Sequence, residues 1–395
     1  MSITIIIGTS AAGLAAANKL RDLDPSAEII CLTKESSMPY NRCLLADFLG
    51  GSRTKEQVHT KTQPFFAEKN IDLQLDVEVT GLDVVAKKII LRSGSMLAYD
   101  NLIIATGRSA FVPTPIDVSL PGIFPFYDLD HATDILSYQA ATKARRVLVI
   151  GAGITGLECT DALHQRGLEV TVVERSTQVL ARQIDNDGAL FLQDLMARKG
   201  ITLHLGTTVA SVETLQVRNQ PAYRVTLGNG KVIEVDKIIA ATGGRQNLGF
   251  AQAAGITCDQ FGIVTDESQA TNIPNVFAAG DVCSIINLAS GKRTFSTLWP
   301  DAVAQGLTVA NSIVGLCKPF AGTLNITSTN IFDITLVTCG DFSATNGLDI
   351  LSKSAPDFYH RFYLNDGILQ AFVMVGNVGS VGQLRKAILE KTRIG

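Results

Sequence analysis

The chain has 395 residues, of which 46% are hydrophobic and 18% charged, and its formal net charge is −3. Such a length and composition are typical of a globular protein with two or three domains. The near-neutral charge argues against a nucleic-acid-binding protein, which normally carries a basic patch. No run of about 18 apolar residues occurs, so no membrane span is expected, and the N-terminus does not resemble a signal peptide.

The first predicted strand, residues 3–7, leads into Gly8-Thr-Ser-Ala-Ala-Gly13 and a helix. This is the G-x-G-x-x-G spacing of a dinucleotide-binding turn, with Ser10 in the place of the second glycine. Serine is small enough for close approach of a phosphate, and its hydroxyl could bind that phosphate. Glu35 follows the next strand, at 29–33, and is the candidate ligand of an adenosine ribose. The alternative is a solvated loop acid.

The next segments are less regular. Apolar residues from Leu44 to Leu49 have helical spacing, which predicts a short helix with Arg42 and Cys43 near its N-terminus. Further strands are expected at residues 73–79 and 88–91, with a hairpin around 93–95, and at 99–108, which ends in Ala-Thr-Gly. The proline-rich residues 112–122 are typical of a crossing between domains.

Residues 146–174 carry the most specific pattern. An apolar strand precedes Gly151, Gly153 and Gly156, and a helix and a second strand follow before Glu174. The glycines allow a sharp turn, close approach of a pyrophosphate and tight helix packing, while the helix N-terminus attracts the anion. This order predicts a dinucleotide site, although a glycine-rich turn of another α/β protein would share part of it.

The second half repeats the first. Residues 236–247 again show an acid, an apolar strand, Ala-Thr-Gly and an arginine, as residues 99–108 do. We infer an internal duplication in which each half is a dinucleotide fold. A strand ending in Gly280-Asp281, a helix over 298–315, strands at 331–338, 358–364 and 368–375, and a final helix complete the chain. The residues from 319 onward are expected to form a small α+β domain.

The seven cysteines are scattered and odd in number, which predicts neither a disulfide framework nor a metal site, and the histidines form no metal-binding pattern. A reducing cytoplasm is the expected compartment. The cysteines are Cys31, Cys43, Cys159, Cys258, Cys283, Cys317 and Cys339.

Five ordered motifs resemble the FAD-dependent pyridine nucleotide-disulfide oxidoreductase superfamily: GTSAAG, YDNLIIATG, GAGITG with Glu174, IIAATGGRQN and NVFAAGDV. The resemblance implies an α/β fold with two Rossmann-like dinucleotide-binding domains, the NAD domain being inserted in the FAD domain, plus a small C-terminal α+β domain. The expected boundaries are 1–112 and 245–318 for FAD, 113–244 for NAD(P) and 319–395 for the C-terminal domain. YNRCLLADFLGG and LWPDAVAQG look most like NADH:rubredoxin oxidoreductases and the flavin domain of nitrite reductases.

The resemblance also implies which residues bind FAD and NAD, and it implies no metal-binding residue. The turn at Thr297 to Trp299 would lie near the flavin, and the helix after it would stabilise the reduced flavin. The FAD candidates are Gly8, Ser10, Ala11, Ala12, Gly13, Glu35, Arg42, Val79, Thr106, Gly107, Gly280, Asp281, Thr297, Leu298 and Trp299. The NAD candidates are Gly151, Gly153, Ile154, Thr155, Gly156, Glu174, Gly243 and Gly244.

The implied function is a FAD-dependent NAD(P)H oxidoreductase that passes electrons from NADH through FAD to an external acceptor, such as rubredoxin, ferredoxin or an associated metalloenzyme. The carboxylate of Glu174 repels a 2′-phosphate and favours NADH, although Arg175 partly offsets this. The partner would be a redox protein or a small-molecule acceptor, without nucleic acid, and the C-terminal domain would cover the flavin or form a homodimer contact.

Two alternatives remain open at this stage. In single-cysteine relatives of this superfamily, namely disulfide or persulfide reductases and NADH oxidases or peroxidases, one cysteine beside the flavin is redox-active. Cys43 occupies the corresponding stretch, where a helix N-terminus and Arg42 would favour its thiolate; otherwise it is a small residue lining the FAD site. The other alternative is a non-catalytic flavoprotein that senses nucleotides.

Overall fold

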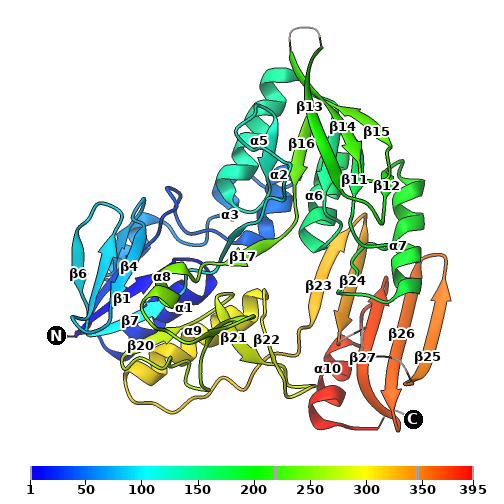
Figure 1. The fold of residues 1–395 in the computed structure, drawn as a ribbon. Coiled ribbons are helices and arrows are strands. Elements are labelled where there is room, and N and C mark those ends of the chain that lie inside the picture. Colours follow the sequence, from blue (N-terminus) through cyan, green and yellow to red (C-terminus); the bar gives the residue numbers. More distant parts are fainter. Residues whose placement is uncertain (1, 218–219, 341, 343–344, 346, 394–395) are drawn as a thin grey trace. The chain divides into compact units, whose positions relative to one another are not determined.

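The computed structural model describes residues 2–217, 220–340, 342, 345 and 347–393. They form two compact units, each assembled from separate stretches of the chain (Figure 1). Unit 1 comprises Met1–Cys43, Lys55–Ser109 and Arg245–Asn325, and unit 2 comprises Leu44–Thr54, Ala110–Gly244 and Ile326–Gly395. The chain leaves unit 1 within β8 (Arg108–Ala110) and returns to it within β17 (Gly244–Gln246).

Unit 1 is built on a five-stranded parallel sheet in the order β20-β7-β1-β2-β3. A parallel sheet is covered on both faces, so its central strands are mostly apolar. Ile5 and Ile7 of β1 belong to the core on one face, and Ile6 belongs to the core on the other. The strands are β1 (Ile3–Ile7), β2 (Glu28–Leu32), β3 (Asp72–Gln74), β7 (Asn101–Ile104) and β20 (Val276–Ala278).

Helices and smaller sheets complete unit 1. Helices α1 and α9 contribute to the core that contains Ile6, and the small sheet β4-β5-β6 contributes to the other core. The elements are α1 (Ala11–Leu23), α3 (Lys55–Val58), α4 (Gln63–Glu68), α8 (Gly249–Ala253), α9 (Trp299–Ile313), β4 (Val79–Asp83), β5 (Lys88–Leu91), β6 (Met96–Ala98), β18 (Cys258–Asp259), β19 (Gly262–Val264), β21 (Cys283–Ile286) and β22 (Arg293–Thr294).

The prediction of one strand over residues 73–79 was wrong. Asp76 has a φ of +57°, a left-handed conformation that ends β3, and β4 starts only at Val79. The strand at 88–91 and the hairpin at 93–95 are confirmed by the pairing of β5 with β6. The short helix predicted after Cys43 is also confirmed, as a 3₁₀ turn over Arg42–Leu44 followed by α2 (Leu45–Gly50).

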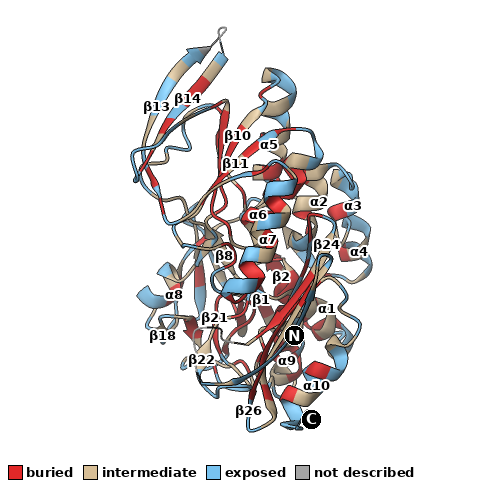
Figure 2. Ribbon diagram, turned by 90° about the vertical axis from the view of Figure 1, so that its right-hand side faces the viewer, coloured by how far each residue is buried: buried red, intermediate tan, exposed pale blue. Residues whose placement is uncertain are grey.

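Unit 2 contains a second parallel sheet, in the order β12-β11-β10-β16-β9. In Figure 2, β10 and β11 are coloured mainly as buried, as expected for central strands of a covered sheet. The elements are β9 (Ile123–Pro125), α5 (Leu129–Thr142), β10 (Arg146–Ile150), α6 (Ile154–Gln165), β11 (Glu169–Val173), α7 (Asn186–Arg198), β12 (Thr202–His204), β13 (Val209–Val217), β14 (Gln220–Leu227), β15 (Val232–Val235) and β16 (Lys237–Ala240).

The C-terminal part of unit 2 is a five-stranded antiparallel sheet, β23-β24-β27-β26-β25, with α10 packed on β27. The predicted strands at 358–364 and 368–375 and the final helix are confirmed. The single strand predicted at 331–338 was wrong, because Phe332 and Asp333 have positive φ and form a hairpin turn. The elements are β23 (Thr327–Ile331), β24 (Ile334–Cys339), β25 (Asp349–Ala355), β26 (Phe358–Asn365), β27 (Ile368–Val375) and α10 (Val381–Glu390).

The carboxylate of Asp185 joins this sheet to α7. Its Oδ1 accepts the N–H of Gly188 (2.9 Å), which caps the helix, and its Oδ2 accepts the hydroxyls of Tyr359 (2.7 Å) and Tyr363 (2.5 Å) from β26. Unit 2 is therefore held together by buried polar contacts as well as by apolar packing. The three-domain boundaries predicted from the sequence stay predictions. None of the described helices combines the length and apolar character that crossing a bilayer requires.

Candidate nucleotide-binding sites

In unit 2, the glycine turn after β10 has the geometry that a phosphate site needs. A Cβ on Gly151 would lie 2.6 Å from the carbonyl oxygen of Ala241, and one on Gly156 would lie 2.0 Å from that of Gly151. These two glycines are therefore required for packing of the turn. A Cβ on Gly153 would meet nothing within 4 Å, so the space above the second glycine is open to a pyrophosphate.

Helix α6 starts directly at this turn, with Gly153 as its N-cap. The N–H groups of the first helical turn, which includes Ile154, Thr155 and Gly156, have no partner within the helix. They and the positive end of the helix dipole attract an anion. The predicted residues from Gly151 to Gly156 are thus brought together in one anion-binding arrangement.

Glu174 lies at the same turn. Its Oε2 accepts the N–H of Ala152 at 2.8 Å, and its Oε1 accepts the N–H of Ser176 at 2.7 Å. Each carboxylate oxygen has two lone pairs, so both can accept a further hydrogen bond from a ribose hydroxyl. Gly243 follows β16, and its carbonyl accepts the N–H of Phe111 at 2.9 Å, while a Cβ on Gly243 would meet nothing within 4 Å. Gly244 begins β17.

The first turn of unit 1 repeats this geometry around Gly8. A Cβ on Gly8 would lie 2.1 Å from the carbonyl oxygen of Ala105, and one on Gly13 would lie 1.9 Å from that of Gly8. Ser10 is the N-cap of α1, yet its side chain makes no capping hydrogen bond, which is unusual for serine at this position. Its hydroxyl is therefore not committed to α1. Ala11 and Ala12 form the first helical turn and are buried.

Charged residues form a cluster in unit 1. Arg42 donates a hydrogen bond to Glu35 in an ion pair, and both side chains are partly exposed. Burial raises the pKa of Asp281 to about 6, while the positive charges of Arg108 and Arg42 oppose this rise. Arg42 thus interacts electrostatically with two other predicted FAD residues, Glu35 and Asp281. Arg108, which packs its guanidinium on the ring of Phe295, was not predicted.

Asn247 holds the Ala-Thr-Gly loop of unit 1. Its amide Nδ2 donates to the carbonyl of Thr106 at 2.8 Å, its backbone N–H donates to that of Gly107 at 3.1 Å, and its Oδ1 accepts from Ser109 at 2.8 Å. Sequence reasoning gave Asn247 no role. Its position at the end of the repeated motif IIAATGGRQN is the feature that could have identified it.

The middle of α9 packs against the first turn of α1. A Cβ on Gly306 would lie 2.2 Å from the carbonyl oxygen of Ala12, so the two helices touch through their backbones. Trp299 begins α9 and belongs to the same apolar cluster as Ala12. The N–H of Gly280 donates to the side chain of Gln305 at 2.9 Å, which fixes the loop after β20 against α9.

The remaining predicted FAD residues lie in two places. Leu298 is the N-cap residue of α9, directly after Thr297, and its N–H donates to the hydroxyl of Ser296 at 3.2 Å. Val79 lies in the core on the other face of the sheet, with Ile7 and Leu32, and is only 8% exposed. The structure therefore does not bring Val79 to the cluster that contains Trp299.

Cys43 is exposed, and its N–H donates to the side chain of Asn41 at 3.0 Å. Four of the seven cysteines, Cys31, Cys159, Cys283 and Cys339, are buried. Burial raises the pKa of the Cys31 thiol to about 12, which leaves it unreactive. Cys43, the residue predicted to be redox-active, is by contrast accessible to a substrate. Among the described residues, no group of three or more metal-ligating side chains occurs.

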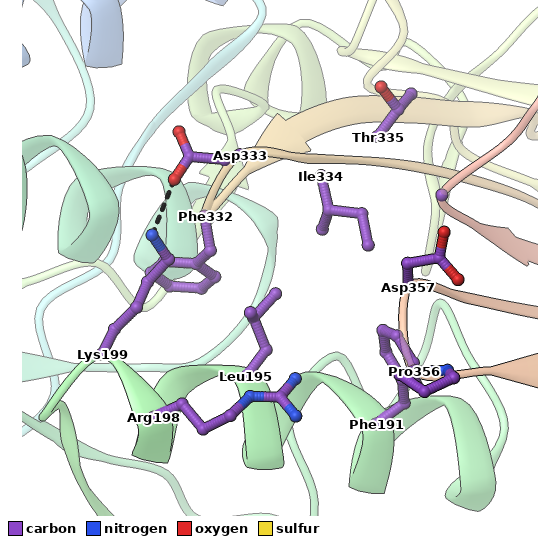
Figure 3. Close-up of a pocket in the computed structure, with 11 residues that line it drawn as sticks. Phe191, Leu195, Arg198, Lys199, Phe332, Asp333, Ile334, Thr335, Pro356 and Asp357 are labelled. Carbon is purple, nitrogen blue, oxygen red and sulfur yellow. Dashed lines mark hydrogen bonds and ion pairs between the residues drawn. The ribbon is translucent and has the colours of Figure 1, made fainter.

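A separate pocket of about 520 Å³ lies within unit 2, between α7 and the turns of the C-terminal sheet. Figure 3 shows Phe191 and Leu195 of α7 facing Ile334 and Pro356, with the ion pair between Lys199 and Asp333 (2.7 Å) at one side. Its lining contains none of the residues predicted to bind FAD or NAD.

Comparisons with known proteins agree with this architecture. The sequence pattern of the pyridine nucleotide-disulphide oxidoreductase family matches residues 3–306. The chain therefore belongs to this FAD-binding family of NAD(P)H-dependent oxidoreductases.

Its relatives have different named activities. The chain is 32% identical over 336 residues to an NADH oxidase of Methanocaldococcus jannaschii, covering 84% of this chain and 74% of the relative. It is 29% identical to a rubredoxin-NAD(+) reductase of Pseudomonas putida, covering 80% of each. Its structure is similar to that of a NAD-dependent persulfide reductase from A. fulgidus, with a TM-score of 0.90, 25% identity and coverage of 99% of this chain and 77% of the other.

Proposed function

We propose that this chain passes electrons from NADH through FAD to an external acceptor, such as rubredoxin, ferredoxin or an associated metalloenzyme. The observation that carries the proposal is the pair of glycine turns, at Gly8 and Gly151, each followed by a helix whose first N–H groups are available to a pyrophosphate. Two such sites in one chain fit one flavin nucleotide and one nicotinamide nucleotide.

In unit 1, the α1 N-terminus and the Ser10 hydroxyl would bind the FAD pyrophosphate, and Glu35 would bind the ribose. In unit 2, the α6 N-terminus would bind the NADH pyrophosphate. Bound FAD supplies the chemistry of accepting a hydride and releasing the electrons singly or in pairs. The protein's part in that step is to orient the nucleotides and exclude water, and no side-chain acid or base is required.

Glu174 is the proposed determinant of cofactor choice. Its carboxylate already faces two backbone N–H groups of the turn, at Ala152 and Ser176, and is therefore held where the ribose would lie. A second negative charge on the ribose would be repelled at that position. We therefore propose NADH rather than NADPH as the substrate.

A second candidate function rests on Cys43. This residue is exposed, and relatives of the chain are named NADH oxidase and persulfide reductase. In this alternative, Cys43 reduces a disulfide, a persulfide, a peroxide or oxygen. Transfer to a redox protein remains the preferred proposal, because the Tyr-Asn-Arg ahead of Cys43 resembles the NADH:rubredoxin oxidoreductases more closely.

The test is anaerobic titration of the purified flavoprotein with NADH, and in parallel with NADPH. We expect rapid bleaching of the flavin by NADH and slower bleaching by NADPH. The Cys43→Ser variant should keep its NADH:rubredoxin or NADH:ferredoxin activity. Loss of turnover in this variant, together with a thiolate-to-flavin charge-transfer band in the reduced parent, would establish the cysteine mechanism instead. Sluggish flavin reduction by both nucleotides would favour a nucleotide-sensing role.

A further inference from the structure

We propose that the pocket between α7 and the turns of the C-terminal sheet binds an amphipathic monocarboxylate, a small molecule with an apolar body and a single carboxylate group. The pocket lies within unit 2, and its lining contains none of the predicted nucleotide-binding residues. Binding there is therefore independent of the proposed redox function. Three features support it: the apolar wall of the pocket, a constrained turn at its side and the charges at its mouth.

The wall of the pocket is apolar, and its size suits a small molecule. Phe191 and Leu195 lie one turn apart on the same face of α7, and Figure 3 shows them facing Ile334 and Pro356. None of these four side chains is fully buried, so a ligand could cover apolar surface that the fold leaves accessible. The volume of about 520 Å³ falls in the range of about 300–1,000 Å³ that is typical of small-molecule sites.

The turn at Phe332 and Asp333 has an unusual backbone. Their φ angles are +54° and +65°, a left-handed conformation that is costly for a bulky aromatic residue. Two contacts hold the turn in place: the N–H of Phe332 donates to Asp161 at 2.9 Å, and Asp333 pairs with Lys199 at 2.7 Å. Strained residues persist where the surrounding structure fixes them, and they cluster at ligand-binding positions. This side of the pocket is therefore formed before any ligand binds.

Arg198 is the charge that selects the ligand. It lies one turn after Leu195 on α7 and is exposed, and Figure 3 shows its guanidinium group beside Leu195. Among the described residues, none forms an ion pair or a hydrogen bond with this guanidinium group. The other cation of the lining, Lys199, is already paired with Asp333. A guanidinium group offers two parallel N–H donors that match a carboxylate, so Arg198 favours a carboxylate at the end of the apolar wall.

Acidic residues at the mouth limit the ligand to one negative charge. Asp333 and Asp357 both line the pocket and are exposed. A second carboxylate or a phosphate dianion would be repelled by them. An uncharged ligand would leave Arg198 without a partner, and a cationic ligand would bring its charge close to the guanidinium group. A single carboxylate on an apolar body therefore matches both the wall and the mouth.

A matched ligand series tests this choice. Isothermal titration calorimetry of the FAD-loaded protein should show binding of octanoate. Octanol and octylamine should bind about tenfold more weakly, because neither offers a carboxylate to Arg198. Suberate, which carries a second carboxylate at the other end of the same chain, should also bind more weakly. The affinity should fall about fourfold for each methylene group removed from octanoate, as expected for an apolar wall.

Paired variants test the place of binding. Arg198→Gln should weaken octanoate binding about tenfold and leave octanol binding unchanged, because only the carboxylate needs the guanidinium group. Arg385→Gln is the control, because it changes an exposed arginine of α10 outside the lining. Leu195→Asp should abolish octanoate binding, because it puts an anion on the apolar wall. Leu190→Asp is the matched control on the same helix, since Leu190 is 52% exposed and does not line the pocket.

Absence of octanoate binding at millimolar concentration overturns the proposal. Equal affinities for octanoate and octanol, or equal losses in Arg198→Gln and Arg385→Gln, contradict the role of the guanidinium group and overturn it as well. Competition between octanoate and NAD⁺ would place octanoate in the nucleotide site instead. The melting temperature of each variant separates loss of the pocket from loss of the fold. NADH-dependent flavin reduction reports separately on the proposed function, and its failure would leave the octanoate result unchanged.

Discussion

The guanidinium group of Arg42 forms an ion pair with the carboxylate of Glu35, so two residues predicted to bind FAD are bound to each other in unit 1. Arg42 also lowers the pKa of Asp281, another predicted FAD residue, against the effect of burial. Arg42 therefore interacts with two acidic residues at the proposed flavin site, and Arg108 acts on Asp281 in the same direction.

Replacement of Arg42 should weaken FAD binding. In Arg42→Met, Glu35 loses its cation, and the repulsion between the two acidic residues and an anionic cofactor is offset less, with Arg108 alone acting on Asp281. A hydrogen bond to a charged group contributes about 1.5–3 kcal/mol, so FAD affinity should fall about tenfold or more. Release of FAD during dialysis, followed by flavin fluorescence, measures this. Arg53→Met, which removes an exposed ion pair with Asp47 (3.3 Å), should behave like the parent; equal FAD loss in both variants would contradict the role of Arg42.

Two glycines of the second turn should respond differently to alanine. In Gly153→Ala the new Cβ has open space, so the fold should keep its melting temperature while NADH binding weakens. In Gly156→Ala the new Cβ would lie 2.0 Å from a carbonyl oxygen, and the structure should be destabilised by about 3 kcal/mol or more. Thermal denaturation and NADH titration separate the two effects. Unchanged NADH affinity in Gly153→Ala would show that the pyrophosphate does not bind above this residue.

Removal of the Glu174 charge should change cofactor choice. Glu174→Gln keeps an oxygen that can accept the N–H of Ala152 or Ser176, but it no longer repels a 2′-phosphate. We expect the ratio of kcat/KM for NADPH to that for NADH to rise about tenfold, which corresponds to about 1.4 kcal/mol. Steady-state kinetics with both nucleotides checks this. The prediction fails if the ratio stays at the value of the parent.

Glu158 on α6 should make stability depend on pH. Desolvation raises the pKa of its carboxyl group from 4.5 to about 7, although Thr329 donates a hydrogen bond to it at 2.6 Å and opposes the rise. Because the folded state disfavours the charged carboxylate, the free energy of unfolding falls as the pH rises from 4.5 towards 7. Glu158→Gln should therefore increase the free energy of unfolding by about 1–3 kcal/mol at pH 8 and by much less at pH 4.5.

Urea denaturation at the two pH values measures this difference. Glu213→Gln is the control, because Glu213 is well exposed and lies 3.9 Å from Arg224. A gain in Glu158→Gln that is equal at both pH values would contradict the pKa argument.

The sequence predicts the parts of the fold that depend on local geometry. The glycine turns at Gly8 and Gly151 follow from spacing alone, because only glycine fits so close to the carbonyls of Ala105 and Ala241. Strand ends that depend on single backbone angles were missed, as at Asp76 and at Phe332. β25 was missed because most of its residues are polar and exposed.

The candidate sites, like the fold, could be predicted from the sequence only where local spacing determines them. Spacing identifies the turns and their acidic residues, but the ion pair of Glu35 with Arg42, seven positions apart, lies in irregular chain and has no periodic pattern. Asn247 lies 141 positions from Thr106, whose loop it holds, so its role becomes visible only in three dimensions. The proposed roles of individual residues in cofactor binding stay predictions.

The carboxylate of Asp185, which receives both a helix cap and two tyrosine hydroxyls, has a practical consequence for protein engineering. Truncation after residue 325 would remove both tyrosines and Arg361, whose guanidinium lies 3.4 Å from the same carboxylate, and would leave Asp185 with only the cap of α7. The tail is thus not a detachable module: a shortened version of this chain would lose the polar contacts that join α7 to the C-terminal sheet.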